Sequence, residues 1–179
     1  MKFLFSWKGL LIAIIILLVL IAFLINFRIE SYDRYDKVDE FNFELSWGPY
    51  GKKNISTFND TITKDLMSAG IVTTDYILPR YVKKRIYNML RDMKILSFPS
   101  QLDLNYIDKE RNDNLYLRVV INGEENVVSC RVPWGYDLKG VGEETVHNYQ
   151  FMTLTNYISK YVYGTDEWNS LPKSVGGYL

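Results

Sequence analysis

The chain has 179 residues, with 21 basic and 21 acidic side chains, one His and one Cys. This length predicts one ordinary domain plus a smaller segment. A single Cys excludes an internal disulfide framework and a multi-Cys zinc site, and a single His excludes a His-rich metal site. Without residues 1–27 the chain carries 19 basic and 21 acidic groups, a net charge of −2 that gives it no strong electrostatic attraction to nucleic acid or anionic lipid.

The N-terminal region contains a long apolar run. Leu10 to Ile25 are all apolar, and no charged residue lies between Lys8 and Arg28. Nineteen uncharged residues at ~1.5 Å each would form a helix of roughly 28 Å, close to the ~30 Å core of a bilayer. We therefore predict a cytoplasmic flank at 1–8 and a transmembrane signal anchor at 9–27.

A cleaved signal peptide is the main alternative for this run. Its apolar core would be shorter, about 7–15 residues, and a small-x-small cleavage site would follow it. No good site follows Ile25, so an uncleaved anchor is favoured. Lys and Arg are nearly balanced at the two ends of the run, and the short N-terminal flank favours placing the C-terminal domain outside the cytoplasm.

Residues 28–40 mix both charges without an apolar period and are expected to form a solvated stalk. From residue 41 apolar and polar residues alternate, which predicts a half-buried strand over 41–47. Turn residues follow at 48–51, and further short strands are expected over 55–58, 61–66 and 71–77.

Two helices and a hairpin are expected in the rest of the chain. Apolar residues at helical spacing predict a helix that starts at Pro79 and stops before Phe98, and a second helix over 143–162. Between them, two alternating segments joined by Asn122-Gly123 predict a hairpin. Together these patterns predict an α+β domain over 41–179, with an antiparallel sheet and two helices packed on one of its faces, preceded by the single transmembrane helix.

Candidate catalytic residues are few. Glu144 and His147 form one Glu-x-x-His, whereas a carboxylate-bridged di-metal site needs that motif twice. Cys130 lies in a predicted strand, away from the helix N-terminus or neighbouring His that would activate a thiol. No Gly-x-Ser-x-Gly, His-Glu-x-x-His or phosphate-binding Gly-rich loop occurs. We therefore predict no catalytic residue, no metal and no cofactor.

Surface groups suggest binding instead. Aromatic residues on Gly-containing loops are the candidate contacts with a partner, because they give a large contact area at low entropic cost; they are Trp47, Tyr50, Trp134 and Tyr136. Packing at the edges of the core is the alternative role for them. The first helix carries a basic face that would meet anionic lipid headgroups or wall polymers, or be simply solvated; it consists of Arg80, Lys83, Lys84, Arg85 and Arg91.

Several short motifs resemble a group of small uncharacterised proteins of Gram-positive bacteria that carry an export signal, a membrane anchor or a lipid anchor. The resemblance covers 41–179 and lies in Phe41-Asn-Phe43, Gly48-Pro-Tyr-Gly-Lys52, Ser56-Thr-Phe58, Thr63-Lys-Asp65, Ile86-Tyr87, Phe98-Pro99, Leu171-Pro172 and Gly176-Gly-Tyr-Leu179. These are turn and packing residues, so the resemblance implies an extracytoplasmic setting and no particular activity.

Two functional hypotheses follow. The first is a non-catalytic binding or protein-interaction module at the cell membrane, with the bilayer as partner through residues 9–27 and an envelope protein or wall polymer as a further partner, but no nucleic acid. The second is a small envelope hydrolase whose site is assembled only by folding, with His147, Cys130 and Asp137 as the first suspects. If the topology is reversed, the chain would instead be a membrane adaptor that faces the cytoplasm.

Overall fold

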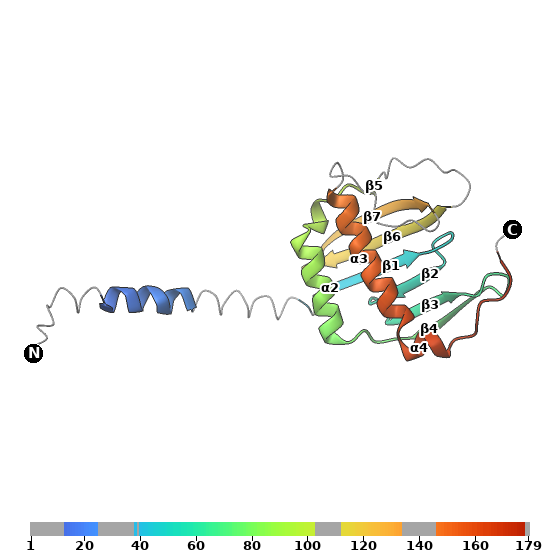
Figure 1. Ribbon diagram of the computed structural model, residues 1–179, viewed down its shortest axis with the longest axis horizontal. Coiled ribbons are helices and arrows are strands. Elements are labelled where there is room, and N and C mark those ends of the chain that lie inside the picture. Colours follow the sequence, from blue (N-terminus) through green and yellow to red (C-terminus); the bar gives the residue numbers. More distant parts are fainter. Residues whose placement is uncertain (1–12, 25–37, 39, 103–111, 134–145, 178–179) are drawn as a thin grey trace, which may run out of the picture. The chain divides into compact units, whose positions relative to one another are not determined.

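The computed structural model describes the whole chain except residues 1–12, 25–37, 39, 103–111, 134–145 and 178–179 (Figure 1). The chain divides into two compact units, Met1–Val38 and Asp39–Leu179. In the first unit, the described residues form one helix over 13–24.

The predicted transmembrane helix is wrong, and the signal-anchor and single-pass interpretations that depend on it are withdrawn. Among the helices that the structure describes, none combines the length and the apolar character needed to cross a membrane. Of residues 9–27, the structure describes 13–24, and these are helical. The sequence predicted one helix over 9–27, of which residues 9–12 and 25–27 lie outside the described part of the chain.

The second unit is an α+β domain. Its described residues form seven strands in one sheet, three α-helices and one short 3₁₀ helix (Figure 1). In chain order these are β1 (Phe41–Trp47), β2 (Lys53–Ser56), β3 (Thr61–Asp65), β4 (Ile71–Asp75), α2 (Arg80–Asp92), η1 (Ile95–Ser97), β5 (Gln101–Leu102), β6 (Asn112–Ile121), β7 (Glu124–Pro133), α3 (Val146–Tyr163) and α4 (Asp166–Ser170).

The strand order in the sheet is β4-β3-β2-β1-β6-β7-β5. The first six strands in that order pair antiparallel, as predicted. β5 pairs parallel with β7, so the sheet is mixed and the prediction of a purely antiparallel sheet is wrong. β5 has only two residues, too few for an alternating pattern to be recognised in the sequence.

The strand and turn patterns explain the sheet. β1 alternates strictly between buried and half-buried side chains, which confirms the predicted period of two. Asn122 and Gly123 both have positive φ, 53° and 82°, as a two-residue hairpin turn requires, and they join β6 to β7. These two features fix which side of the central strands faces the core.

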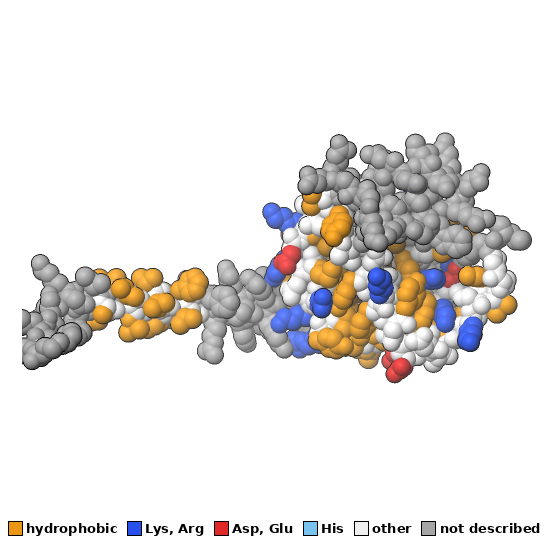
Figure 2. Space-filling view, in the orientation of Figure 1, with side chains coloured by type: hydrophobic (Ala, Val, Ile, Leu, Met, Phe, Trp, Pro, Cys, Tyr) orange, Lys and Arg blue, Asp and Glu red, His pale blue; other side chains and the backbone are white. Residues whose placement is uncertain are grey.

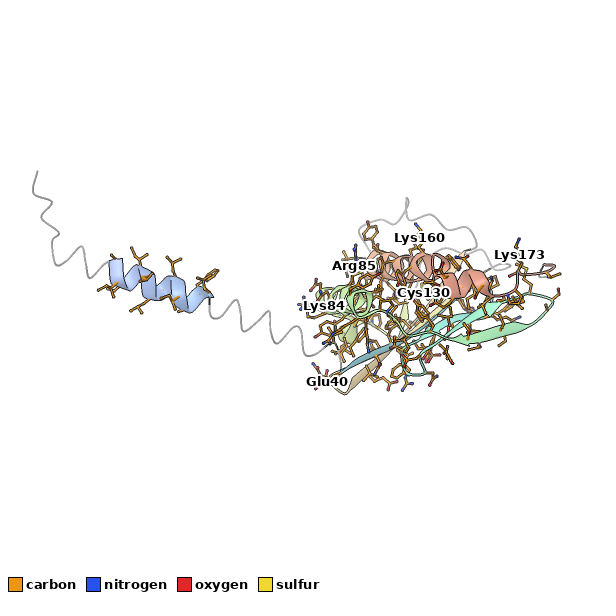
Figure 3. All side chains as sticks on the ribbon, turned by 90° about the horizontal axis from the view of Figure 1, so that it is seen from below. Glu40, Lys84, Arg85, Cys130, Lys160 and Lys173 are labelled. Carbon is orange, nitrogen blue, oxygen red and sulfur yellow. The ribbon has the colours of Figure 1, made fainter. Side chains whose placement is uncertain are left out.

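Both long helices pack on one face of the sheet (Figures 1 and 3). The core lies between the two layers, and its largest fully buried side chains include Phe41, Phe43, Leu117, Phe151 and Leu154. The η1 segment is tied to β7 by the Asn126 amide, which donates to the carbonyls of Ile95 at 2.8 Å and Phe98 at 3.1 Å. Among the described residues, no helix covers the opposite face of the sheet (Figure 3).

Candidate functional site

The uncovered face of the sheet is the candidate site, and we call it the open face. Register places alternate residues of six adjacent strands on it. They are Asn42, Glu44 and Ser46 of β1, Asn54 of β2, Thr61 and Thr63 of β3, Thr73 and Asp75 of β4, Tyr116, Arg118 and Val120 of β6, and Glu125, Val127 and Ser129 of β7. Ser56 of β2 lies on the same side of the sheet but is only 2% exposed. Most of these side chains end in a hydroxyl, amide or charged group that can donate or accept hydrogen bonds.

Cross-strand hydrogen bonds order this face. The Asn54 amide donates to the Glu44 carboxylate at 2.9 Å and to the Ser46 hydroxyl at 3.0 Å. The hydroxyl oxygens of Thr63 and Thr73 lie 2.9 Å apart. Because each pair joins neighbouring strands, the side chains are held in fixed positions and lose less freedom when a ligand binds.

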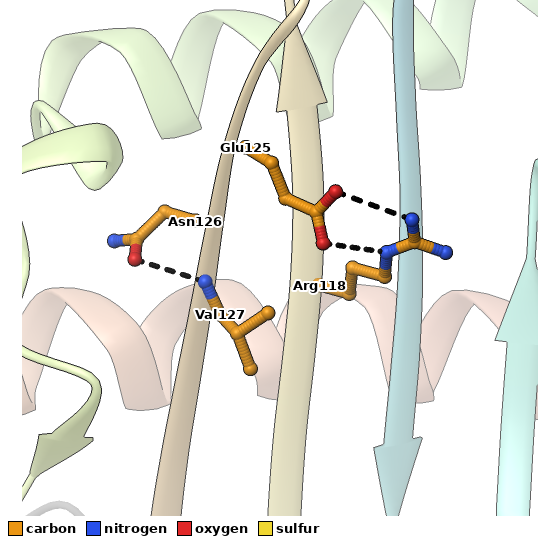
Figure 4. Close-up of polar contacts among 4 residues, drawn as sticks. All are labelled: Arg118, Glu125, Asn126 and Val127. Carbon is orange, nitrogen blue, oxygen red and sulfur yellow. Dashed lines mark hydrogen bonds and ion pairs between the residues drawn. The ribbon is translucent and has the colours of Figure 1, made fainter.

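Arg118 lies on the open face on β6, next to the central strand β1. Its guanidinium donates to both carboxylate oxygens of Glu125, at 2.9 and 3.2 Å (Figure 4). The same group lies 4.6 Å from the centre of the Phe58 ring, and Glu44 faces it across β1 and β6. The hydrogen bond from Arg118 lowers the pKa of the Glu125 carboxyl, and the hydrogen bond to Glu125 raises the pKa of the Arg118 guanidinium.

The lowered pKa of Glu125 gives a testable prediction. A carboxyl whose pKa is lower in the folded state stabilises the fold above its unfolded pKa, and that contribution is lost as the pH falls through the folded pKa. We expect the Glu125 carboxyl to titrate below its ordinary value of 4.5 in a carbon-detected NMR titration, and Arg118→Gln to return it toward that value. The matched control is Arg131→Gln, which removes another exposed arginine of the same sheet. Equal midpoints in the two variants would refute the pairing.

A tight turn brings a tyrosine to one end of the open face. Gly48 and Gly51 both have positive φ, and the Gly51 N–H donates to the Gly48 carbonyl at 2.9 Å. A Cβ atom built on Gly51 would lie 3.7 Å from the Cβ of Ser46, so the turn packs against the open-face side of β1. Between these glycines, Tyr50 also adopts positive φ, 58°, and its side chain is 67% exposed.

This conformation of Tyr50 is unusual. A bulky residue with positive φ is uncommon, and such a conformation costs of order 1 kcal/mol or more. Core packing does not offset that cost, because the ring lies largely in solvent, with the Lys52 ammonium 5.5 Å from its centre. Tyr116, which pairs with Ser46 at the same end of β1, is a second exposed tyrosine at 39%. We call Tyr50, Lys52 and Tyr116 the tyrosine surface.

The four aromatic residues singled out in the sequence have different positions. Tyr50 is exposed as described above, whereas Trp47 is only 4% exposed. Its indole N–H donates to the Tyr163 hydroxyl at 2.7 Å, and its ring stacks on Trp168 at 6.2 Å, so Trp47 links the sheet to the helices. Trp134 and Tyr136 lie outside the described residues.

The structure describes two of the three residues suspected of catalysis, Cys130 and His147. Cys130 is 3% exposed and faces the helix layer from β7. His147, exposed in the first turn of α3, packs its ring on Phe98 with the centres 4.2 Å apart. Asp137 lies outside the described residues. Within the part of the chain that the structure describes, no group of three or more His, Cys, Asp or Glu is placed to hold a metal ion.

Two residues of the site, Tyr116 and Arg118, were not singled out in the sequence. The alternation of β6 was visible there, and it placed Leu115, Leu117 and Val119 inside. The same pattern puts Tyr116 and Arg118 outside, but it does not show that the outer face is left without a helix. No protein-family model matches the chain, and no curated protein matches it either.

Proposed function

We propose that residues 39–179 act as a non-catalytic protein-interaction domain, with the tyrosine surface as the main contact and the adjoining part of the open face beside it. The proposed setting is the cell envelope, outside the cytoplasm, as the sequence resemblance implies. The observation that carries the proposal is the conformation of Tyr50, a bulky side chain with positive φ that is exposed at 67%.

The composition of the surface supports this role. Tyrosine gives a large contact area for the loss of only two side-chain rotations, and neighbouring Ser, Thr and Asn supply adaptable hydrogen bonds. Tyr50 and Tyr116 provide the contact area. The adaptable hydrogen bonds would come from Ser46, Asn54 and Thr63. Arg118, held by Glu125, adds an ordered guanidinium, another side chain that is enriched at interface centres.

The proposal is tested by quantitative affinity capture with the full chain as bait. Because tyrosines at interface centres carry much of the binding energy, Tyr50→Ala and Tyr116→Ala are each expected to weaken partner binding by about tenfold or more. Tyr149→Ala, which removes a 53% exposed tyrosine from α3, is the control and is expected to leave binding unchanged. Partner recovery that is insensitive to both substitutions, or equally sensitive to the control, would refute the proposal.

A further inference from the structure

Charge is unevenly distributed between the two layers of the domain. Helices α2 and α3 carry six basic residues and one acidic residue, Asp92, a net charge of +5. The seven strands carry four basic and six acidic residues, a net charge of −2. The small net charge of the chain therefore conceals a basic helical face, and Figure 2 shows Lys and Arg side chains on it with few acidic ones.

The basic groups on this face adjoin exposed apolar and aromatic side chains. The Arg85 guanidinium lies 4.9 Å from the centre of the Tyr157 ring, which joins α2 to α3, and Lys160 follows one turn along α3. Tyr81, one turn before Arg85 on α2, is 74% exposed, and Ile77, in the segment between β4 and α2, is 78% exposed. We call these five residues the α2–α3 seam: Ile77, Tyr81, Arg85, Tyr157 and Lys160.

Hydrogen bonds between tyrosine side chains join the two helices at the seam. The Tyr81 side chain hydrogen-bonds to the Tyr161 hydroxyl, which also lies 3.3 Å from the hydroxyl of Tyr76. Burial raises the pKa of Tyr161, and its hydroxyl is a hydrogen-bonding link between α2 and α3. In Figure 3, Arg85 and Lys160 lie on the side of the helices that faces away from the sheet.

We propose that the α2–α3 seam binds the surface of a bilayer that contains anionic phospholipids. Cations beside exposed aromatic and aliphatic side chains are typical of protein surfaces that lie on lipid headgroups. A soluble polyanion would need only the ionic contacts with Arg85 and Lys160, and it would leave the Ile77 and Tyr81 side chains in water.

A second observation points to the same partner. In the first unit, the helix over 13–24 exposes large apolar side chains all around, with exposed fractions between 43% and 66%. Exposed apolar surface of this kind marks a contact with lipid or protein. Stable attachment to a membrane surface usually combines an apolar contact with a basic patch, and this chain carries both.

The inference is independent of the proposed function but has a consequence for it. The seam and the open face lie on opposite sides of the same domain. A bilayer under the helices would leave Arg118 and the rest of the open face directed toward the aqueous phase.

The test is co-flotation of the full chain with phosphatidylcholine vesicles that contain or lack phosphatidylglycerol. The apolar helix contributes to binding in both cases, so the ratio of the two partition coefficients measures the electrostatic part. Each Lys or Arg near an anionic surface is worth about fivefold in binding. We therefore expect the double variant Arg85→Gln/Lys160→Gln to lower the ratio by about 25-fold. The control is Arg131→Gln/Lys173→Gln, which removes the same charge from exposed sites outside the seam and should retain the ratio.

Three outcomes would overturn the inference. One is a wild-type ratio close to one, and another is an equal loss in both double variants, which would indicate a general effect of net charge. The third comes from a parallel measurement with soluble inorganic polyphosphate. Seam-dependent binding to polyphosphate without any preference for phosphatidylglycerol vesicles would show that the partner is a soluble polyanion.

Discussion

Phe43→Ala is expected to lower the free energy of unfolding of the second unit by about 3–5 kcal/mol, the usual cost of removing a fully buried phenyl ring. The Phe43 side chain has no exposed surface and stacks on Phe41 with the ring centres 5.6 Å apart. It lies on the central strand of the sheet and faces the helix layer. The truncation therefore leaves a cavity where the two layers meet.

Urea unfolding followed by circular dichroism measures this change, with the midpoint and slope compared between variants. Tyr116→Ala is the matched control, because Tyr116 lies on the neighbouring strand β6 but on the open face. It is expected to cost less than about 1 kcal/mol, as surface substitutions do. A loss for Phe43→Ala no larger than that of the control would contradict the assignment of the two faces.

Trp168→Ala is expected to have the second large effect, again about 3–5 kcal/mol. Trp168 is 7% exposed, and its ring lies 6.2 Å from that of Trp47 and 5.3 Å from that of Tyr163. The Lys64 ammonium also lies 5.3 Å from the centre of the Trp168 ring. This single side chain therefore joins α4 and the end of α3 to β1 and β3, and its loss would loosen the helix layer at that end.

Tyr163→Phe separates the polar part of this cluster from its packing. It keeps the ring but removes the hydroxyl that accepts the Trp47 indole hydrogen bond at 2.7 Å. An indole N–H left without a partner in a partly buried position costs about 1–3 kcal/mol, so the loss should be smaller than for Trp168→Ala. The same urea experiment measures both variants, and a larger loss for Tyr163→Phe would show that the cluster is held by its polar contacts.

Local patterns predicted the elements of the domain well. Alternation in 41–47 and the Asn122-Gly123 turn were sufficient for β1 and for the β6–β7 hairpin, because both depend on neighbouring residues. The order of strands in the sheet and the parallel pairing of β5 depend on how distant segments dock, and no periodicity reveals that. The transmembrane prediction rested on composition alone, and no helix among the described residues is long and apolar enough to cross a membrane.

The candidate site was partly predictable. Glycines on both sides of Tyr50 marked an exposed turn, and the structure places Tyr50 there. Trp47 stands in the same motif and is buried, because Tyr163 and Trp168 pack on it from the other end of the chain. Its burial was not visible in the sequence, because it depends on contacts between residues more than a hundred positions apart. Arg118 was not predicted either. Its place in the candidate site depends on one face of the sheet being left without a helix, and this too is decided by how distant segments pack.

The central claim is that a protein partner docks on the tyrosine surface, and site-specific photo-crosslinking in intact cells tests it most directly. A photoreactive phenylalanine analogue would replace Tyr50 in one variant, Tyr116 in a second and Tyr149 in a third, each in the full chain. We predict a discrete crosslinked protein of the same identity from positions 50 and 116, and none from position 149 on the helical face. The same adduct from position 149, or no discrete adduct from positions 50 and 116, would contradict the claim.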